Sequence, residues 1–171
     1  AASRMPISDY LRDLRTLVGT RLVLMPSVAA VIFDDTGRVL LARHSVGGVW
    51  STPGGAIDPD ETPQDATVRE VWEELRLDVE PLRCLGTFGG PEFRITYANG
   101  DEVAYVITAF ECRIVGGEMR PDGDEVLEAR WFGIAELSGL ALSNWARSVL
   151  PEIVARRAAW VPPATWRPPA P

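Results

Sequence analysis

The stretch GGAIDPDETPQDATVREVWEEL, residues 54–75, carries a dense run of acidic side chains, with Glu70, Glu73 and Glu74 crowded together. The pair Thr62–Pro63 predicts where a helix begins, because threonine is a favoured N-cap and proline suits the first helical position. At about 100° per residue the three glutamates share one face, and the apolar residues share the opposite one. The stretch therefore predicts a helix with a core face and a carboxylate face.

The carboxylate face needs an explanation, because like charges repel. Pairs at i,i+3 and i,i+4 cost a few tenths of a kcal/mol each in water, and more where the site is partly desolvated. Arg69 can pair with Glu73, yet one arginine leaves a surplus of negative charge. Magnesium prefers oxygen ligands and is commonly held jointly by carboxylates and substrate phosphates. The residues alone allow two interpretations, a divalent-cation site or a solvated acidic face.

The segment also resembles the Nudix box, the signature of the Nudix hydrolases, whose pattern is G-x5-E-x7-R-E-U-x-E-E-x-G-U with U a bulky apolar residue. The matching positions are Gly55, Glu61, Arg69, Glu70, Val71, Glu73, Glu74 and Leu77.

One position departs from the pattern. Arg76 stands where the pattern has its last glycine, which in the family ends the helix. A non-glycine residue in a left-handed conformation costs about 1 kcal/mol, which favours a different helix end here. The departure leaves open the geometry of the following loop and the range of substrates.

The resemblance implies the α/β Nudix fold, a mixed curved β-sheet sandwiched between helices. Around the acidic helix, residues 21–43 are typical of paired strands joined by a tight hairpin at DDTG, and EARWF indicates a closing strand. Asn99-Gly100 predicts a hairpin with a type I′ turn. Residues 8–18 predict an additional amphipathic helix at the N-terminus, with Ser8 as its N-cap.

The length of 171 residues fits one domain. We interpret residues 1–4 as an expression remnant before Met5, residues 5–160 as a single Nudix hydrolase domain, and residues 161–171 as an extended, poorly ordered proline-rich tail. Within the domain, a helix is expected after Trp131, interrupted by Pro151.

Composition excludes several classes of function. All 17 basic residues are arginines, so no lysine can serve as nucleophile or Schiff base. The net charge of −7 argues against binding long nucleic acids, which needs a positive surface. No apolar run approaches the roughly 20 residues that span a bilayer, and the N-terminus lacks the features of a secretory signal. We expect a soluble cytoplasmic protein without a membrane partner.

The resemblance assigns roles within the acidic helix. Glu70 and Glu74, one turn apart, are the first choice as ligands of magnesium, or of manganese in its place, and Glu73 completes the cluster. Arg69 is expected to hold Glu73 or Glu61 in position. Backbone atoms of the Gly54–Gly55 pair are expected to approach metal and substrate closely, because glycine permits close approach.

A general base is still required, and the family often draws one from the loop before the closing strand. Glu125 is the candidate there, with an exposed loop carboxylate as the alternative. Glu73 competes for the role, and Glu102 is a weaker candidate. Arg43, at a strand end, is either a phosphate contact or an ordinary surface arginine.

Other side chains have two interpretations each. His44, which is the only histidine, is interpreted as a surface residue, with a substrate contact as the alternative. Aromatic residues that are either core or stacking partners for a base are Trp50, Phe88, Phe93 and Tyr97.

Taken together, the resemblance implies a metal-dependent pyrophosphohydrolase that cleaves a nucleoside diphosphate linked to another moiety (NDP-X) into NMP and P-X by water attack on phosphorus. The alternative is a Nudix-like domain that binds a nucleotide without cleaving it. A nucleotide-type small molecule is the expected substrate. The helix at residues 8–18 and the one after Trp131 are candidates for a homodimer interface.

Overall fold

The computed structural model describes residues 7–165, so the interpretation of residues 1–4 lies outside the described residues, as do positions 166–171 of the tail. The helices of the described part are α1 (Asp9–Val18), α2 (Pro63–Leu75), α3 (Ile134–Leu137), α4 (Asn144–Arg156) and the 3-10 helix η1 (Pro91–Phe93). Its strands are β1 (Val23–Ile32), β2 (Val39–His44), β3 (Trp50–Ser51), β4 (Leu77–Phe88), β5 (Arg94–Thr96), β6 (Glu102–Gly117) and β7 (Val126–Phe132).

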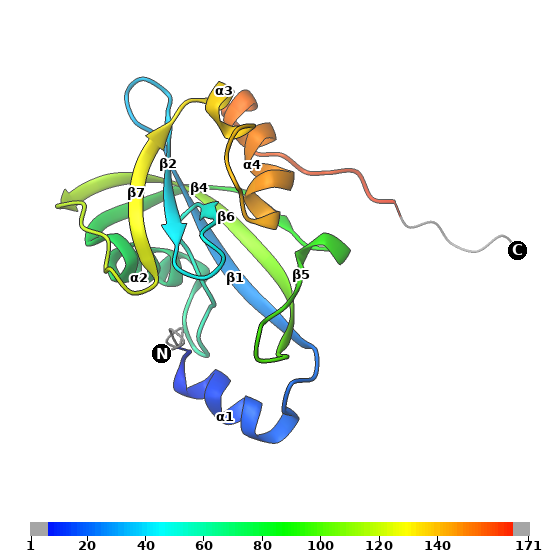
Figure 1. Ribbon diagram of the computed structural model, residues 1–171. Helices are drawn as coiled ribbons and strands as arrows, with labels where there is room; N and C mark the ends of the chain where they lie inside the picture. The colour runs from blue at the N-terminus through cyan, green and yellow to red at the C-terminus, as the bar shows by residue number, and fades with distance from the viewer. Residues whose placement is uncertain (1–6, 166–171) are drawn as a thin grey trace, which may run out of the picture.

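The strands form two sheets, and together with the helices they make a mixed α/β fold (Figure 1). In the mixed sheet, β6 lies between β1, to which it is parallel, and β4, to which it is antiparallel, while β5 pairs with the start of β6. The second sheet is antiparallel, with β2 between β3 and β7.

The tight turn expected at DDTG is confirmed, since the amide of Gly37 donates to the carbonyl of Asp34 at 3.0 Å. The expected pairing of β1 with β2 is wrong, because the two strands enter different sheets and the turn is flanked only by an isolated bridge between Phe33 and Val39. The reason is burial on both faces of β1, whose last six residues are all buried. Such a strand belongs inside a covered sheet rather than in a local ribbon.

Two layers of core cover the faces of the sheets, with α2 on one side and α4 on the other (Figure 1). Side chains alternate along β1, so Val28 and Ala30 pack towards α2, whereas Ala29 and Val31 pack towards α4. Ala66, Val71 and Leu75 of α2 are buried in this core, and their packing positions the helix against the sheet.

The two ends of α2 are set by local chemistry. Thr62 is the N-cap, and its hydroxyl accepts a hydrogen bond from the amide of Asp65, as the sequence predicts. The expectation of a different C-terminal end is wrong, because Arg76 adopts the left-handed conformation, with φ 59° and ψ 25°. Its guanidinium compensates in part by donating to the carbonyl of Trp72 at 3.1 Å. The helix thus ends as a glycine would end it.

Replacing Arg76 with glycine is expected to change the free energy of unfolding by less than about 1 kcal/mol, because relief of left-handed strain is offset by greater freedom of the unfolded chain. The glycine variant also loses the hydrogen bond from the Arg76 guanidinium to the carbonyl of Trp72, which further offsets the gain in stability. Urea denaturation and kcat/KM on the same preparations check this. Since Arg76 does not line the cavity described below, a large loss of activity in the glycine variant would contradict the expectation.

Other local predictions have mixed outcomes. The N-terminal helix is confirmed as α1, with Ser8 capping it through the amide of Leu11. The β5–β6 hairpin exists, but the type I′ turn is wrong, because Gly100 has a positive φ whereas Asn99 does not. Helix α4 continues through Pro151 instead of being interrupted.

The C-terminal segment after α4 has no regular secondary structure up to residue 165. It nevertheless packs on the domain, since the amide of Trp160 donates to the carbonyl of Leu85 at 2.9 Å and its ring stacks on Phe88. No helix within residues 7–165 combines the length and the apolar character needed to cross a membrane.

Candidate active site

A cavity of about 670 Å³ opens beside the carboxylate face of α2, between β1, the β5–β6 hairpin and the first turn of α4. Its acidic lining residues are Asp58, Glu70, Glu73, Glu74 and Glu125. Its apolar and aromatic lining includes Leu11, Met25, Phe93, Tyr97 and Tyr105. The cavity therefore joins a strongly anionic wall to a wall suited to an uncharged organic group.

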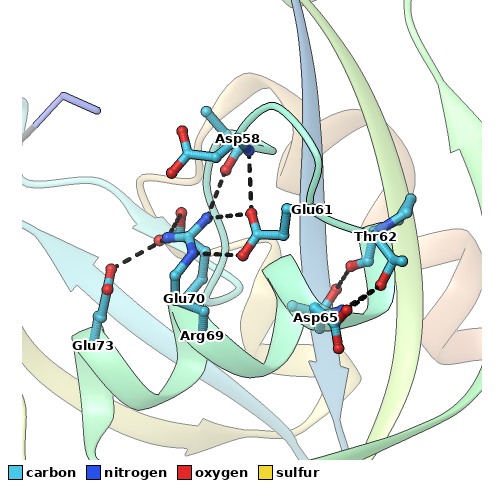
Figure 2. A network of polar contacts seen from close by, with 10 residues as sticks. Asp58, Glu61, Thr62, Asp65, Arg69, Glu70 and Glu73 are labelled. Carbon is cyan, nitrogen blue, oxygen red and sulfur yellow. Dashed lines mark hydrogen bonds and ion pairs between the residues drawn. The ribbon is translucent and has the colours of Figure 1, made fainter. Parts of the chain in front are cut away.

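Arg69 organises part of the anionic wall (Figure 2). Its guanidinium binds both carboxylate oxygens of Glu61, at 2.8 and 2.9 Å. It also donates to Glu70 at 2.8 Å and to the more exposed Glu73 at 3.2 Å. A fifth hydrogen bond, to the carbonyl of Ala56 at 3.0 Å, fixes it to the loop before α2. One guanidinium thus ties Glu61, Glu70 and Glu73 to the loop before α2.

Glu74 lies deepest and has no arginine partner among its described contacts. The residue is 2% exposed, and its carboxylate accepts one hydrogen bond, from the amide of Gly54 at 3.3 Å. Burial raises the pKa of Glu74 well above its usual value, and the nearby charges of Glu70 and Glu125 raise it further. A buried carboxylate without a paired cation is costly, so this position is one where a cation would be favourable.

The Gly54–Gly55 pair allows the loop to pass close to these carboxylates. A Cβ on Gly54, whose φ is +152°, would lie 2.1 Å from the carbonyl oxygen of Val28. A Cβ on Gly55 would lie 2.5 Å from Oε1 of Glu70. A side chain at Gly54 would clash with the backbone of β1, and one at Gly55 would displace the Glu70 carboxylate, so the pair brings its backbone against the anionic wall.

Glu125 reaches the same wall from the loop before β7. The carboxylate of Asp122 accepts hydrogen bonds from the amides of Asp124, Glu125 and Val126, which shapes the loop. The amide of Asp122 in turn donates to the carbonyl of Glu74 at 3.0 Å. Burial, with Glu70 as the next contributor, raises the pKa of Glu125 to about 7. A carboxyl group with this pKa is suited to exchange protons near neutral pH.

These residues fit a hard divalent cation. The buried, unpaired carboxylate of Glu74 lies with Glu70 and Glu125 around a glycine loop, and carboxylate oxygens are the donors that magnesium prefers. Within residues 7–165 no three histidine, cysteine, aspartate or glutamate side chains already converge on one point. Arg69 instead draws Glu70 and Glu73 towards itself, which reduces the repulsion among the carboxylates.

Several predicted residues lie elsewhere. Arg43 pairs with Glu128 across β2 and β7 at 3.1 Å and does not line the cavity, so a phosphate contact does not fit its geometry. Glu102 pairs with Arg94 and is also outside the cavity lining. The surface interpretation of His44 is wrong, since this residue is half-buried and lines the cavity, and burial lowers its pKa.

The aromatic candidates divide in two. Phe93 and Tyr97 line the cavity, whereas Trp50 packs edge-on against Phe132 and Phe88 packs in the core. Sequence reasoning missed cavity residues that carry no motif, among them Ser27, Thr52, Tyr105, Asn144 and Trp145. Alternation along β1 was the one available signal for Ser27, a polar residue within an apolar strand.

Comparisons with known proteins agree with this geometry. The NUDIX domain matches residues 23–153. An isopentenyl-diphosphate Delta-isomerase of Mycolicibacterium vanbaalenii is 38% identical over 133 residues, which cover 70% of this chain and 71% of that protein. A MutT-like protein of Streptomyces ambofaciens is 34% identical over 112 residues, covering 66% of each chain.

Two further similarities are informative. The NAD-capped RNA hydrolase NudC of Pseudomonas fluorescens is 32% identical over 130 residues, which cover 74% of this chain but 44% of that protein. The crystal structure of a MutT protein from Methanosarcina mazei Go1 superimposes with a TM-score of 0.62 at 26% identity, covering 78% of this chain and 94% of the other.

Fold, site and comparisons define a class of enzyme, the Nudix pyrophosphohydrolases. The chain belongs to the Nudix hydrolase family and is MutT-like within it. Hydrolases of this family generally use divalent metals such as Mg2+ and act on nucleotide derivatives.

Proposed function

We propose that this protein hydrolyses NDP-X compounds to NMP and P-X, using Mg2+, or Mn2+ in its place. The observation that carries the proposal is the buried carboxylate of Glu74, which lies without a paired cation beside Glu70 at the wall of a substrate-sized cavity. A negative carboxylate in this position is stabilised when a divalent cation binds next to it, and the same cation can neutralise the diphosphate of a substrate.

Each residue of the anionic wall has a separate proposed role. Glu70 and Glu74 would hold the cation, with Glu73 completing the set and backbone atoms of the Gly54–Gly55 pair close by. When bound, the cation supplies charge neutralisation for the phosphate oxygens and acidifies a water molecule. Arg69 holds the glutamates in position through its contacts on the outer side of the cluster.

Glu125 is proposed as the general base. Its carboxylate removes a proton from the attacking water while the water oxygen bonds to phosphorus and the P–O bond of the bridging oxygen breaks. The bridging oxygen leaves with the departing phosphoryl group, which carries the electron pair of that bond. With a pKa of about 7, Glu125 accepts a proton near neutral pH more readily than an ordinary carboxylate does.

The named relatives support a phosphoanhydride substrate but differ in chemistry. NudC acts on NAD-capped RNA by its name, and this chain covers less than half of it. The isomerase relative, at 38% identity, acts on isopentenyl diphosphate by its name. Isomerisation of isopentenyl diphosphate is therefore the second candidate, favoured by that identity and by the apolar lining of the cavity.

A substrate panel distinguishes these functions. ADP-ribose, UDP-glucose, NAD+, diadenosine polyphosphates, nucleoside triphosphates and isopentenyl diphosphate are incubated with the folded protein at increasing Mg2+ or Mn2+. We expect metal-dependent release of an NMP from at least one nucleotide, because cleavage requires a neutralised diphosphate. Tight nucleotide binding without NMP release would favour the non-hydrolytic alternative. If isopentenyl diphosphate were the only compound converted, with conversion monitored by NMR, the result would favour the isomerase function.

The remaining expectations stay predictions. They are a cytoplasmic location, a single domain over residues 5–160, no long nucleic acid partner and a homodimer through α1 and α4.

A further inference from the structure

Helix α1 lies outside the segment that matches the NUDIX domain, yet it forms part of the cavity wall. The match begins at residue 23, whereas α1 ends at Val18. Leu11 of α1 lines the cavity, as do Ile7 and Ser8 directly before the helix. The cavity of this chain therefore has a wall that the matched domain does not include.

One face of α1 is turned towards the domain but is incompletely covered. Half-buried residues recur at helical spacing, at Leu11, Leu14, Arg15 and Val18, whereas none of the residues 9–18 is fully buried. Leu17, outside this face, is 84% exposed. Because Leu11 lines the cavity, a group bound there would remove more of its apolar surface from water.

Arg15 holds α1 in this position. Its guanidinium donates to the carbonyl of Glu102 at 3.0 Å and lies 3.6 Å from the carboxylate of Asp101. Both partners belong to the β5–β6 hairpin, which also supplies Tyr97 and Tyr105 to the cavity lining. Helix α1 and the hairpin are thus joined beside the cavity, and together they supply an apolar and aromatic part of its lining.

The two kinds of wall restrict the ligand that can fill the cavity. The carboxylates and their cation need a diphosphate, whereas the apolar lining needs an uncharged organic group. The volume of about 670 Å³ is typical of sites for ligands larger than a five-carbon chain, which favours a nucleotide over isopentenyl diphosphate. A nucleotide carries both parts, because its base presents large apolar ring faces.

We propose that α1 covers the base of the bound nucleotide, with Leu11 in contact with the ring. The inference rests on the proposed function for the nature of the ligand. It makes Leu11 a substrate-binding residue that determines affinity for the nucleoside part and has no role in holding the diphosphate.

Isothermal titration calorimetry with Mg2+ tests the proposal without requiring turnover. The nucleoside probes are the α,β-methylene diphosphates of adenosine, guanosine, uridine and cytidine, and methylenediphosphonate supplies the same bridge without a nucleoside. Leu11→Ser is expected to weaken the tightest nucleoside probe about tenfold, because serine removes apolar contact with the base, and to leave methylenediphosphonate unchanged. No loss, an equal loss for both kinds of probe, or no binding of any nucleoside probe at millimolar concentration would overturn the proposal.

Leu17→Ser is the matched control, since the same change is made on the same helix at a position that does not line the cavity. We expect it to leave the affinity for both kinds of probe unchanged. Hydrogen exchange on the wild type needs no substitution. The amides of α1 should exchange more slowly with the nucleoside probe bound than with methylenediphosphonate bound, and equal exchange rates would contradict the proposed contact.

The outcomes separate this inference from the proposed function. Release of an NMP in the substrate panel, with nucleoside binding that does not depend on Leu11, would overturn the inference and leave the proposed function standing. Nucleoside binding that depends on Leu11, without hydrolysis, would support the inference and contradict the proposed function.

Discussion

Glu74→Gln is expected to lower kcat/KM by about 10³-fold or more and, at the same time, to stabilise the folded protein. The loss follows because cation-held charge is worth several kcal/mol in a transition state, and each 1.36 kcal/mol is tenfold in rate. The gain follows because a neutral amide removes the buried charge of Glu74 and its repulsion with Glu70 and Glu125. A substitution that lowers activity while it raises stability identifies a carboxylate that is retained for function.

Thermal unfolding with and without Mg2+ checks the stability half of this prediction. Because the pKa of Glu74 is raised in the folded protein, ionisation of this group opposes folding. The stabilisation that protonated Glu74 provides is complete below the pKa of the unfolded chain, and it is lost as pH rises through the pKa of the folded protein. Near pH 8 the variant should have the higher Tm without Mg2+, and added Mg2+ should raise Tm in the wild type far more than in the variant.

Glu80→Gln is the control for this experiment, since the same chemical change is made at an exposed ion pair with Arg113. We expect it to change stability by less than about 0.5 kcal/mol and to leave turnover intact. A Glu74→Gln protein with normal turnover, or with a Tm well below the wild type near pH 8, would refute the role assigned to this carboxylate.

Glu125→Gln is expected to lower kcat by about 10²- to 10⁴-fold, the usual contribution of a positioned general base. Glu73→Gln, the competing assignment, is expected to cost much less, because its side chain is 57% exposed and is bound to Arg69. Single-turnover kinetics on both variants, at saturating Mg2+, separate the chemical step from substrate binding. If Glu73→Gln shows the larger loss, the base assignment moves to Glu73.

The raised pKa of Glu125 also predicts that the difference in stability between the wild type and Glu125→Gln changes with pH. Burial raises the pKa of Glu125 to about 7 from 4.5, so the stabilising contribution of its protonated form is lost as pH rises from about 4.5 through 7. Without metal, the variant and the wild type should be similar near pH 4.5, and the variant should be more stable at pH 8. Subtracting the two curves removes His44, whose lowered pKa acts in the opposite direction. A constant difference across this range would contradict the raised pKa.

The sequence by itself determined the acidic helix and much of its chemistry. Thr62 and Pro63 begin α2, and helical periodicity places Glu70 and Glu74 together, because caps and periodicity act over a few residues. The contacts of Arg69 with Glu61 and Glu73 also followed from the motif. Such features depend on local geometry, so they can be predicted without knowing the rest of the fold.

Only the tertiary structure decided how distant segments meet. The separation of β1 and β2 into two sheets depends on which faces are covered by α2 and α4, and no local pattern specifies that. The approach of Glu125 to Glu74 depends on the loop that Asp122 shapes. Burial and proximity arise from long-range packing, which one stretch of sequence does not encode.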